Sequence, residues 1–191
     1  RIGGSGVEFF LAYRAQQLRE QYGKARRTLR LGFLAPFLDD LVVPAVREFR
    51  QRHPKAQVSL FELPPRAQLD RLRNHELDAA ILGNISESDR TFFNTRTLSR
   101  HKMAALLRED HALAKKKTIK LAELKNERWV SLSDTSFPGR REFLRSFCQQ
   151  AGFDPQIVSE VDSLSMMLGT VTTLGGVALI PGHASKMPHG G

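Results

Sequence analysis

The feature that most constrains the fold of this chain is an alternation of extended and helical patterns between residues 28 and 83. An apolar run, Leu29–Leu34, and a run of alternating polar and apolar residues, Gln57–Glu62, have the composition of strands. The helical pattern between them ends at His53-Pro54, because the residue before a proline is disfavoured in the α conformation. A second helical stretch and a short apolar strand ending at Gly83 follow. This order predicts a parallel sheet with right-handed crossovers.

In a parallel sheet, ligands bind at the carboxyl ends of the strands, where the following helices begin. Phe37 would form an apolar wall of such a site, and Arg66 could reach an anion. Alternatively, Arg66 faces solvent or pairs with Asp70 across one helical turn. The candidate ligand-binding residues of this half are Ala35, Pro36, Phe37, Pro64, Pro65, Arg66, Gly83 and Asn84.

The second half of the chain repeats this architecture without repeating the sequence. Strand patterns cover Arg128–Ser133, Gln156–Val161 and Gly176–Pro181, and helical patterns cover Arg140–Ala151 and Leu164–Leu174. Extended segments near residues 87–107 join the two halves. The sequence therefore predicts an α/β fold with two Rossmann-like lobes around a cleft.

Polar residues also follow the strands of this second lobe. Helix N-termini present free N–H groups and the positive end of the helix dipole, so a small anion or polar molecule could bind there. The alternative is that these residues only cap helices and close turns, and Ser163 is a good N-cap. The candidate ligand-binding residues of this half are Ser133, Thr135, Ser136, Phe137, Asp162 and Ser163.

The N-terminal stretch Val7–Arg27 has the pattern of a long helix. Such a helix spans roughly 30 Å and could pair with its copy in a second subunit, or it could lie on its own domain. The first interpretation predicts an oligomer contact on its apolar face. That face consists of Phe10, Leu11, Ala15 and Leu18. The first lobe then has only three predicted strands, which is few for a stable sheet, and a return segment is missing.

Composition excludes several classes of protein. No apolar run approaches the roughly 20 residues that cross a bilayer, and no secretory signal opens the chain, so we expect a cytoplasmic protein without membrane contact. Cys148 is the only cysteine, and the histidines lack metal-ligand spacing. Neither a P-loop nor a G-x-S-x-G motif is present. We therefore expect no catalytic residues, no metal and no cofactor. The net charge of +9 fits nucleic acid, anionic ligands or solvated surfaces alike.

Six short motifs in order resemble the effector-binding part of LysR-type transcriptional regulators. They are Leu29-Arg30-Leu31-Gly32-Phe33, Pro44 with Phe49 and His53-Pro54, Leu72 with Leu77-Asp78-Ala79-Ala80-Ile81, His111-Ala112-Leu113-Ala114, Ala151-Gly152-Phe153-Asp154-Pro155, and Gly176-Val177-Ala178-Leu179-Ile180-Pro181. Ser5-Gly6-Val7-Glu8-Phe9-Phe10 is similar to the entry of the family's linker helix.

The resemblance implies two lobes of the periplasmic-binding-protein-like type, preceded by a linker helix. It implies promoter DNA as a partner through a winged helix-turn-helix, a small-molecule effector, and assembly as a homodimer or homotetramer. The expected parts are the wing remnant and linker helix (1–27), lobe I (28–97), lobe II (98–181) and a crossing or tail (182–191).

One departure from the family concerns the first lobe. Some members bind an effector carboxylate with hydroxyl side chains after the first two strands, where this chain has Ala35-Pro36 and Pro64-Pro65. Two alternatives to the regulator are a cytoplasmic two-lobed solute-binding protein and an α/β enzyme that uses the same cleft.

Overall fold

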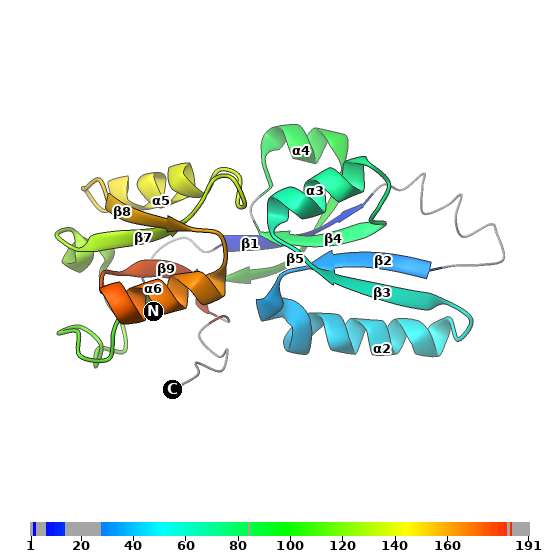
Figure 1. Cartoon of the computed structure of the whole chain (residues 1–191), viewed down its shortest axis with the longest axis horizontal. Coiled ribbons are helices and arrows are strands. Elements are labelled where there is room, and N and C mark those ends of the chain that lie inside the picture. The colour runs from blue at the N-terminus through cyan, green and yellow to red at the C-terminus, as the bar shows by residue number, and fades with distance from the viewer. Residues whose placement is uncertain (1, 3–6, 14–27, 84, 183, 185–191) are drawn as a thin grey trace. The chain divides into compact units, whose positions relative to one another are not determined.

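The computed structural model describes residues 2, 7–13, 28–83, 85–182 and 184 (Figure 1). The chain divides into two compact units, unit 1 (Arg1–Val7 and Arg100–Gly191) and unit 2 (Glu8–Ser99). It therefore passes from one unit to the other twice, between Val7 and Glu8 and between Ser99 and Arg100. We describe each unit by itself.

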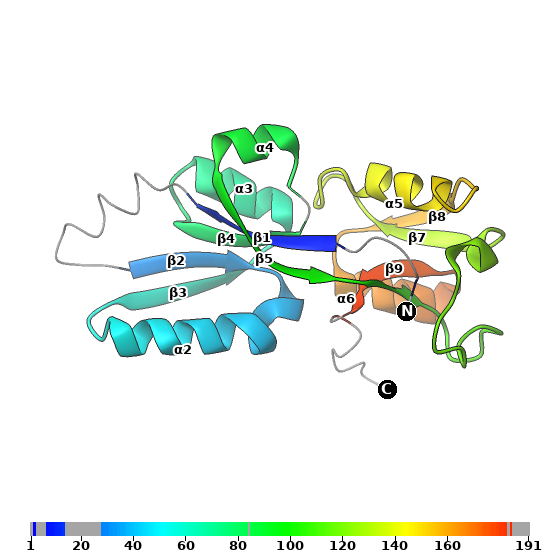
Figure 2. The same ribbon diagram turned by 180° about the vertical axis from the view of Figure 1, so that it is seen from behind.

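Unit 2 is built on a five-stranded sheet with the order β3-β2-β4-β1-β5. Strand β2 pairs in parallel with β3 and with β4, while β1 runs antiparallel to β4 (Figures 1 and 2). The strands are β1 (Val7–Tyr13), β2 (Thr28–Phe33), β3 (Gln57–Glu62), β4 (Ala79–Gly83) and β5 (Asn94–His101). The parallel strand-helix-strand order expected between residues 28 and 83 is confirmed.

The helices of unit 2 begin and end at residues that the sequence marks. Pro65 is the first residue of its helix, a position where the missing N–H costs nothing. The longest helix ends at Arg52, directly before His53-Pro54. Ser86 caps the last helix by accepting a hydrogen bond of 3.1 Å from the Asp89 N–H. The elements are the 3-10 turn η1 (Ala35–Phe37), the π-helical turn η2 (Leu38–Val42), α2 (Val43–Arg52), α3 (Pro65–Arg73) and α4 (Glu87–Phe92).

The sequence predicts a long N-terminal helix, and this prediction is wrong for residues 7–13, which form strand β1. Phe10 and Leu11 pair with Leu82 and Ile81 of β4, so neither belongs to a helical oligomer contact. Ala15 and Leu18 lie outside the described residues. Both faces of β1 are covered, and a short apolar run that is buried all round has no periodicity to separate strand from helix. The strand also resolves the shortage of strands expected in this lobe.

The two faces of β1 pack against different elements of unit 2. On one face, the Phe9 ring meets the Phe37 ring of η1 edge-on, with 4.5 Å between ring centroids. On the other face, Phe10 joins the buried cluster that contains Leu69 and Leu72 of α3. The core of unit 2 therefore depends on β1 from both sides.

An ion pair between a buried carboxylate and a partly exposed arginine connects β2 with the start of β4. The Asp78 side chain is fully buried and accepts hydrogen bonds from Arg30 at three donors: the backbone N (2.7 Å), Nε (3.2 Å) and Nη2 (2.9 Å). The Asp78 backbone N–H in turn donates to the Arg30 carbonyl at 2.9 Å. Such a geometry compensates the desolvation of the carboxylate and explains the aspartate in the motif Leu77-Asp78-Ala79.

Unit 1 contains two strand pairs joined by a bridge. Strands β7 (Arg128–Leu132) and β8 (Gln156–Val161) are parallel, and β6 (Met103–Leu106) and β9 (Ala178–Pro181) are antiparallel. A parallel bridge between Trp129 and Val177 places β9 beside β7. The helices are the 3-10 turn η3 (Leu121–Leu124), α5 (Arg140–Gln149) and α6 (Leu164–Leu174). The strands and helices expected in the second lobe are present, and their bounds differ by at most two residues.

The helices of unit 1 bury apolar side chains against its strands. Met167 and Val171 of α6 pack with Val130 and Leu132 of β7 in one cluster. On α5, Leu144, Phe147 and Cys148 are buried. Burial raises the pKa of the Cys148 thiol to about 12, so this cysteine is a core residue, as the sequence predicts, and not an activated nucleophile.

Substituting Gly83 tests the placement of β1. A Cβ at Gly83 would lie 2.6 Å from the Phe9 ring, so we expect Gly83→Ala to lower the free energy of unfolding by about 1–3 kcal/mol. In a Phe9→Ala background the same substitution becomes nearly neutral, because the overlapping ring is gone. Urea denaturation of the four proteins of this double-mutant cycle measures the coupling.

Gly169→Ala is the matched control. Gly169 lies inside α6, where an added Cβ meets nothing within 4 Å, so this variant gains up to about 1 kcal/mol of stability. If Gly83→Ala lowers the free energy of unfolding by the same amount with and without the Phe9 ring, then β1 does not pack against the end of β4.

Candidate functional site

Two polar residues that are far apart in the sequence meet at the carboxyl ends of β7 and β8. Ser133 follows β7 and Asp162 follows β8, twenty-nine positions later. The Ser133 N–H donates to the Val161 carbonyl at 2.9 Å, which continues the pairing of the two strands by one residue. The Ser133 hydroxyl then donates to the Asp162 carboxylate. The parallel pairing of β7 with β8 thus brings a hydroxyl and a carboxylate together.

Ser136 adds a second hydroxyl to this group. Its Oγ donates to Asp162 Oδ1 at 2.9 Å, and its N–H donates to the Ser133 hydroxyl at 3.3 Å. The hydroxyl of Ser133, and after it that of Ser136, holds the pKa of Asp162 below its ordinary value of 3.8. We call Ser133, Ser136 and Asp162 the strand-end cluster.

The remaining residues predicted in this lobe surround the strand-end cluster in different roles. Ser163 caps α6 by accepting a hydrogen bond of 3.1 Å from the Met166 N–H, so its capping role is confirmed. Phe137 is partly buried against the apolar cluster of β7 and α6, which fits a wall. Thr135 is exposed in the same loop. Sequence reasoning missed Asp134, whose carboxylate accepts a hydrogen bond of 2.9 Å from the Arg141 N–H and caps α5.

The strand-end cluster can accept hydrogen bonds from a ligand. Asp162 is exposed, and both serine hydroxyls donate to its Oδ1. Among the described residues, its Oδ2 has no hydrogen-bond partner. A carboxylate held in this way by neighbouring hydroxyls stays ionised and presents a fixed acceptor. The chemistry that it recognises is therefore a hydroxyl or an ammonium group.

The predicted residues of unit 2 offer apolar surface. Phe37 is buried against Phe9, and Gly83 lies under the Phe9 ring. Pro65 is buried at the start of α3, while Ala35, Pro36 and Pro64 are partly buried. Asn84 lies outside the described residues. Phe37, which the sequence predicted as an apolar wall, is therefore a core residue of unit 2, and only Ala35, Pro36 and Pro64 of this corner are partly exposed.

Arg66 is exposed on α3. Of the two alternatives to ligand binding, solvent exposure is therefore confirmed, and Asp70 Oδ1 accepts from Arg73 Nη1 at 3.1 Å instead of pairing with Arg66. Whether the residues predicted in the two lobes share one ligand stays a prediction, as does the cleft between the lobes.

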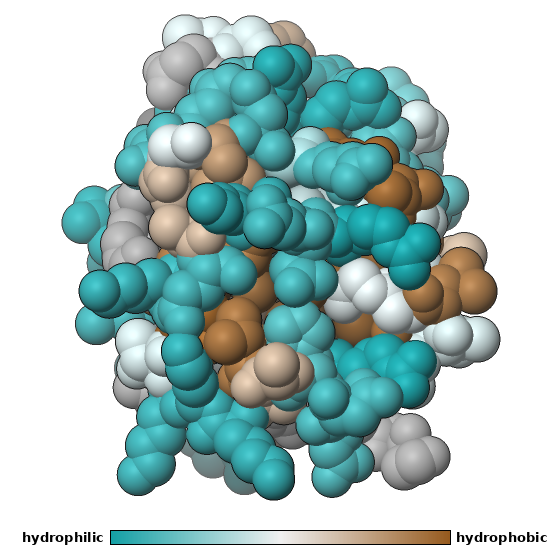
Figure 3. Space-filling view, turned by 90° about the vertical axis from the view of Figure 1, so that its left-hand side faces the viewer, coloured by the Kyte–Doolittle hydropathy of each residue, from teal (hydrophilic) through white to brown (hydrophobic). Residues whose placement is uncertain are grey.

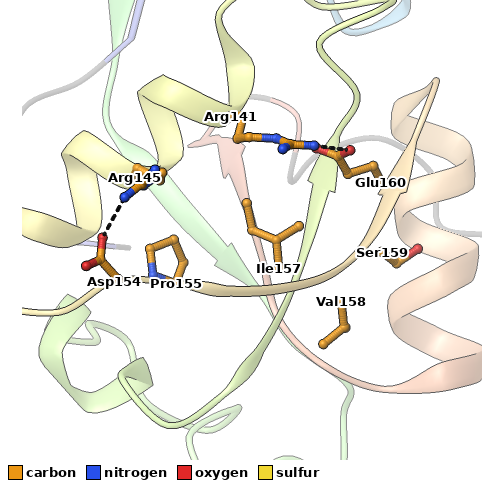
Figure 4. Close-up of a pocket in the computed structure, with 8 residues that line it drawn as sticks. All are labelled: Arg141, Arg145, Asp154, Pro155, Ile157, Val158, Ser159 and Glu160. Atoms are coloured by element: carbon orange, nitrogen blue, oxygen red, sulfur yellow. Dashed lines mark hydrogen bonds and ion pairs between the residues drawn. The ribbon is translucent and has the colours of Figure 1, made fainter.

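Sequence reasoning missed a groove of about 550 Å³ at the outer edge of unit 1, between α5 and β8 (Figure 4). Arg141 forms a bidentate ion pair with Glu160, at 3.1 and 2.7 Å, and Arg145 lies 3.7 Å from Asp154. Val158 lines the same groove and is 50% exposed. Figure 3 looks onto the side of unit 1 and shows hydrophobic residues in separate areas among hydrophilic ones. The sequence signal that could have indicated this groove is Val158, an apolar residue at an outward position of the alternating β8 pattern.

A second groove, of about 480 Å³, lies at the outer edge of unit 2 between α2 and β3. No residue of α2 is buried, although its sequence is amphipathic. Val43 and Leu60 are 39% and 41% exposed there. Its lining residues are Val43, Val46, Arg47, Arg50, Gln51, Pro54 and Leu60.

Within the described ranges, no group of three or more histidine, cysteine, aspartate or glutamate side chains could hold a metal ion. Among the same residues, no helix has both the length and the apolar character needed to cross a membrane.

Most of the chain matches a known protein family. Residues 23–191 match the model of the LysR substrate binding domain. The transcriptional dual regulator GltC of Bacillus subtilis is 28% identical over 169 residues, covering 88% of this chain and 55% of GltC. The regulator BenM of Acinetobacter baylyi is 25% identical over 173 residues, covering 89% of this chain and 56% of BenM. The chain spans about half the length of the curated relatives it matches.

Two solved structures share the fold. The effector binding domain of QuiR in complex with shikimate aligns with a TM-score of 0.72 and 23% identity, over 82% of this chain and 74% of that chain. The BenM effector binding domain with its effector benzoate aligns with a TM-score of 0.69 and 23% identity, over 87% and 75%. The two-lobed, periplasmic-binding-protein-like fold expected from the sequence is thus confirmed.

The hydrogen bonds to Asp162 predict how this carboxyl titrates. We expect Ser133→Ala to raise the pKa of Asp162 more than Ser136→Ala does, because the Ser133 hydroxyl contributes most to lowering it. A carboxyl whose pKa is lower in the folded state stabilises the fold above its unfolded pKa, and this contribution is lost as the pH falls through the folded pKa. The stability difference between the native chain and the double serine variant therefore shrinks from pH 6 towards pH 3.

Carbon-detected NMR titration of the aspartate carboxyls measures this pKa directly. Asp154→Asn serves as the control, because that carboxylate accepts from Gln149 at the other end of β8 and leaves Asp162 unaffected. An Asp162 pKa that is unchanged in both serine variants would contradict the geometry of the cluster.

Proposed function

The chain belongs to the LysR family of transcriptional regulators, and from this premise we propose that its two units sense a small-molecule effector that binds at the strand-end cluster of unit 1. The observation that carries the proposal is the exposed Asp162 carboxylate, which two hydroxyls hold at the carboxyl ends of β7 and β8. Ligands bind at this edge of parallel sheets.

The chemistry of the cluster limits the class of effector. The Asp162 carboxylate favours a ligand with a hydroxyl or ammonium group. The partly buried Phe137 wall in the same loop favours an apolar portion of the ligand beside this group. The effector binding domains of QuiR and BenM are in complex with the small molecules shikimate and benzoate, and of these two only shikimate carries hydroxyl groups that a carboxylate could accept from.

We propose regulation, and not catalysis, as the outcome of binding. The effector would shift the equilibrium between two arrangements of the units and so change transcription, and DNA geometry would reciprocally bias effector affinity. Promoter DNA is the partner that family membership implies for the whole protein, through a winged helix-turn-helix that the described residues do not include.

Ligand-dependent stability tests this function. A ligand that binds only the folded chain, at 100 times its dissociation constant, adds about 2.7 kcal/mol to the free energy of unfolding. We expect one class among a panel of hydroxylated and amino-substituted metabolites to raise the melting temperature. Asp162→Asn then weakens binding by roughly 10- to 100-fold, because a hydrogen bond to a charged group contributes about 1.5–3 kcal/mol.

The matched control is again Asp154→Asn, which removes an exposed carboxylate outside the cluster and leaves ligand affinity unchanged. If Asp162→Asn and Asp154→Asn bind the ligand with the same affinity, the ligand does not bind at the strand-end cluster. Turnover of the ligand would point to an enzyme.

We also propose that two copies of the chain associate through the grooves at α2–β3 and α5–β8. Both β3 and β8 are strands at the edges of their sheets, and both grooves expose apolar side chains. The charged residues of the second groove already pair with each other, Arg141 with Glu160 and Arg145 with Asp154, so the apolar side chains carry this proposal. Contact between the α2–β3 groove of one copy and the α5–β8 groove of another would cover Val43, Leu60 and Val158.

Charged substitutions in the grooves test this association. Leu60→Asp and Val158→Asp each place a charge on an apolar side chain that association would bury, so we expect each to weaken the dimer at least tenfold, by about 1.4 kcal/mol or more. Leu174→Asp is the control, because Leu174 is 68% exposed outside both grooves. Sedimentation equilibrium that gives the same association for all three variants would contradict this interface.

A further inference from the structure

Unit 1 carries an excess of positive charge at the end where β7 begins. Six lysine or arginine residues and only two glutamates lie between Leu113 and Arg128, the first residue of β7. Figure 1 shows this segment in green at one end of unit 1. Its positive residues are all exposed, and we call them the η3 basic surface: Lys115, Lys116, Lys117, Lys120, Lys125 and Arg128.

Both glutamates of this segment already have partners. Lys116 Nζ forms an ion pair with Glu123 Oε1, and the Lys120 N–H donates to Glu123 Oε2 at 2.9 Å. The Lys116 hydrogen bond, and after it that of the Lys120 N–H, holds the pKa of Glu123 below its ordinary value of 4.5. The other glutamate, Glu127, has its Oε1 3.3 Å from His111 Nε2. Within the described ranges, four members of the surface therefore form no ion pair: Lys115, Lys120, Lys125 and Arg128.

The η3 basic surface rests on a fixed apolar base. Ile119, Leu121 and Leu124 alternate with the lysines along the chain and are at most 6% exposed. The ion pair between Lys116 and Glu123 also ties the preceding loop to η3. The positive charges therefore stay together on one patch, although each lysine side chain is flexible.

The composition of this surface favours phosphate groups over a protein as the partner. Protein interfaces are depleted in lysine and enriched in aromatic residues and methionine. Among the described residues, none of the exposed large apolar side chains lies between residues 108 and 128. Lysine binds phosphate as a point charge, and lysines that neutralise DNA phosphates release the counter-ions of the duplex. A surface of lysines without apolar anchors is thus suited to a nucleic-acid backbone.

The η3 basic surface and the strand-end cluster lie at opposite ends of β7. Turn η3 ends at Leu124, shortly before β7 begins, whereas Ser133 follows the last residue of the strand. The two sites share no residue. A partner on the basic surface therefore leaves the Asp162 carboxylate open to an effector.

We propose that the η3 basic surface binds the phosphate backbone of double-stranded DNA without reading its sequence. Unit 1 itself would make this contact, in addition to the winged helix-turn-helix that family membership implies for the whole protein. Contacts to phosphates position a protein on the duplex but carry no sequence information directly. The inference goes beyond the proposed function and does not depend on an effector.

Salt-dependent binding of DNA tests this proposal. In fluorescence anisotropy with a labelled duplex of about 20 base pairs and arbitrary sequence, the logarithm of the affinity of the native chain falls linearly with the logarithm of the salt concentration. We expect the triple variant Lys115→Gln, Lys120→Gln and Lys125→Gln to bind at least about tenfold more weakly at about 50 mM salt. Its slope is flatter by up to about 2.7, because each neutralised phosphate contributes about 0.9. Its melting temperature stays unchanged, since these side chains form no ion pair.

The matched control removes three positive charges elsewhere. Lys55→Gln, Arg96→Gln and Lys102→Gln change exposed residues outside the basic surface, both grooves and the strand-end cluster. This variant has the same net charge as the triple lysine variant, and we expect it to keep the native slope and to lose at most about threefold in affinity. Equal losses in the two variants would overturn the proposal, because overall charge would then explain the binding. No binding by the native chain at about 50 mM salt would overturn it as well.

Two further measurements identify the place and the partner. Titration of the native chain with the duplex shifts the backbone amide NMR signals between residues 114 and 127. Shifts confined to other segments would overturn the proposal, even if the lysine variant failed to fold. Poly-glutamate and phosphatidylserine vesicles are offered at the same concentration of negative charge. Tighter binding of either one than of the duplex would overturn DNA as the partner.

Discussion

The site depends on the parallel pairing of β7 with β8. Parallel strands need a crossover connection, and α5 supplies it here, so the two strands end at the same edge although twenty-nine residues separate Ser133 from Asp162. The Ser133 N–H continues the strand pairing to Val161, and its hydroxyl at once begins the cluster with Asp162. The register in which β7 pairs with β8 therefore determines both where the cluster lies and which side chains form it.

Much of the fold could be predicted because the chain marks its boundaries chemically. His53-Pro54 ends α2, Pro65 begins α3, and Ser163 caps α6 in the structure as in the sequence. Strand β1 could not be predicted, because Val7–Tyr13 is apolar on both faces and only the neighbouring strands decide between helix and strand. The two strands missing from the predicted three-stranded sheet are β1, which was assigned to a helix, and β5, which was assigned to the segments that join the two halves.

Only part of the candidate site could be predicted from the residues alone. Strand ends pointed to Ser133, Ser136 and Asp162, and these three do come together. The sequence shows an apolar residue, Val158, at an outward position of β8. It does not show the groove itself, because α5 forms its other wall.

Polar contacts serve different purposes in the two units. Unit 2 joins β2 to the start of β4 with the Arg30–Asp78 ion pair and packs Phe37 against Phe9 in its core. Unit 1 presents the hydroxyl and carboxylate groups of the strand-end cluster. In the proposed function, the strand-end cluster therefore determines which polar group of an effector is recognised.

Hydrogen exchange of backbone amides, with and without the compound that stabilises the chain most, tests this central claim most directly. Binding at the strand-end cluster predicts slower exchange at Ser136, Phe137 and Met166, whose N–H groups lie in the loop after β7 and at the start of α6. Slower exchange confined to α2 and β3, with no change at those three amides, would contradict it.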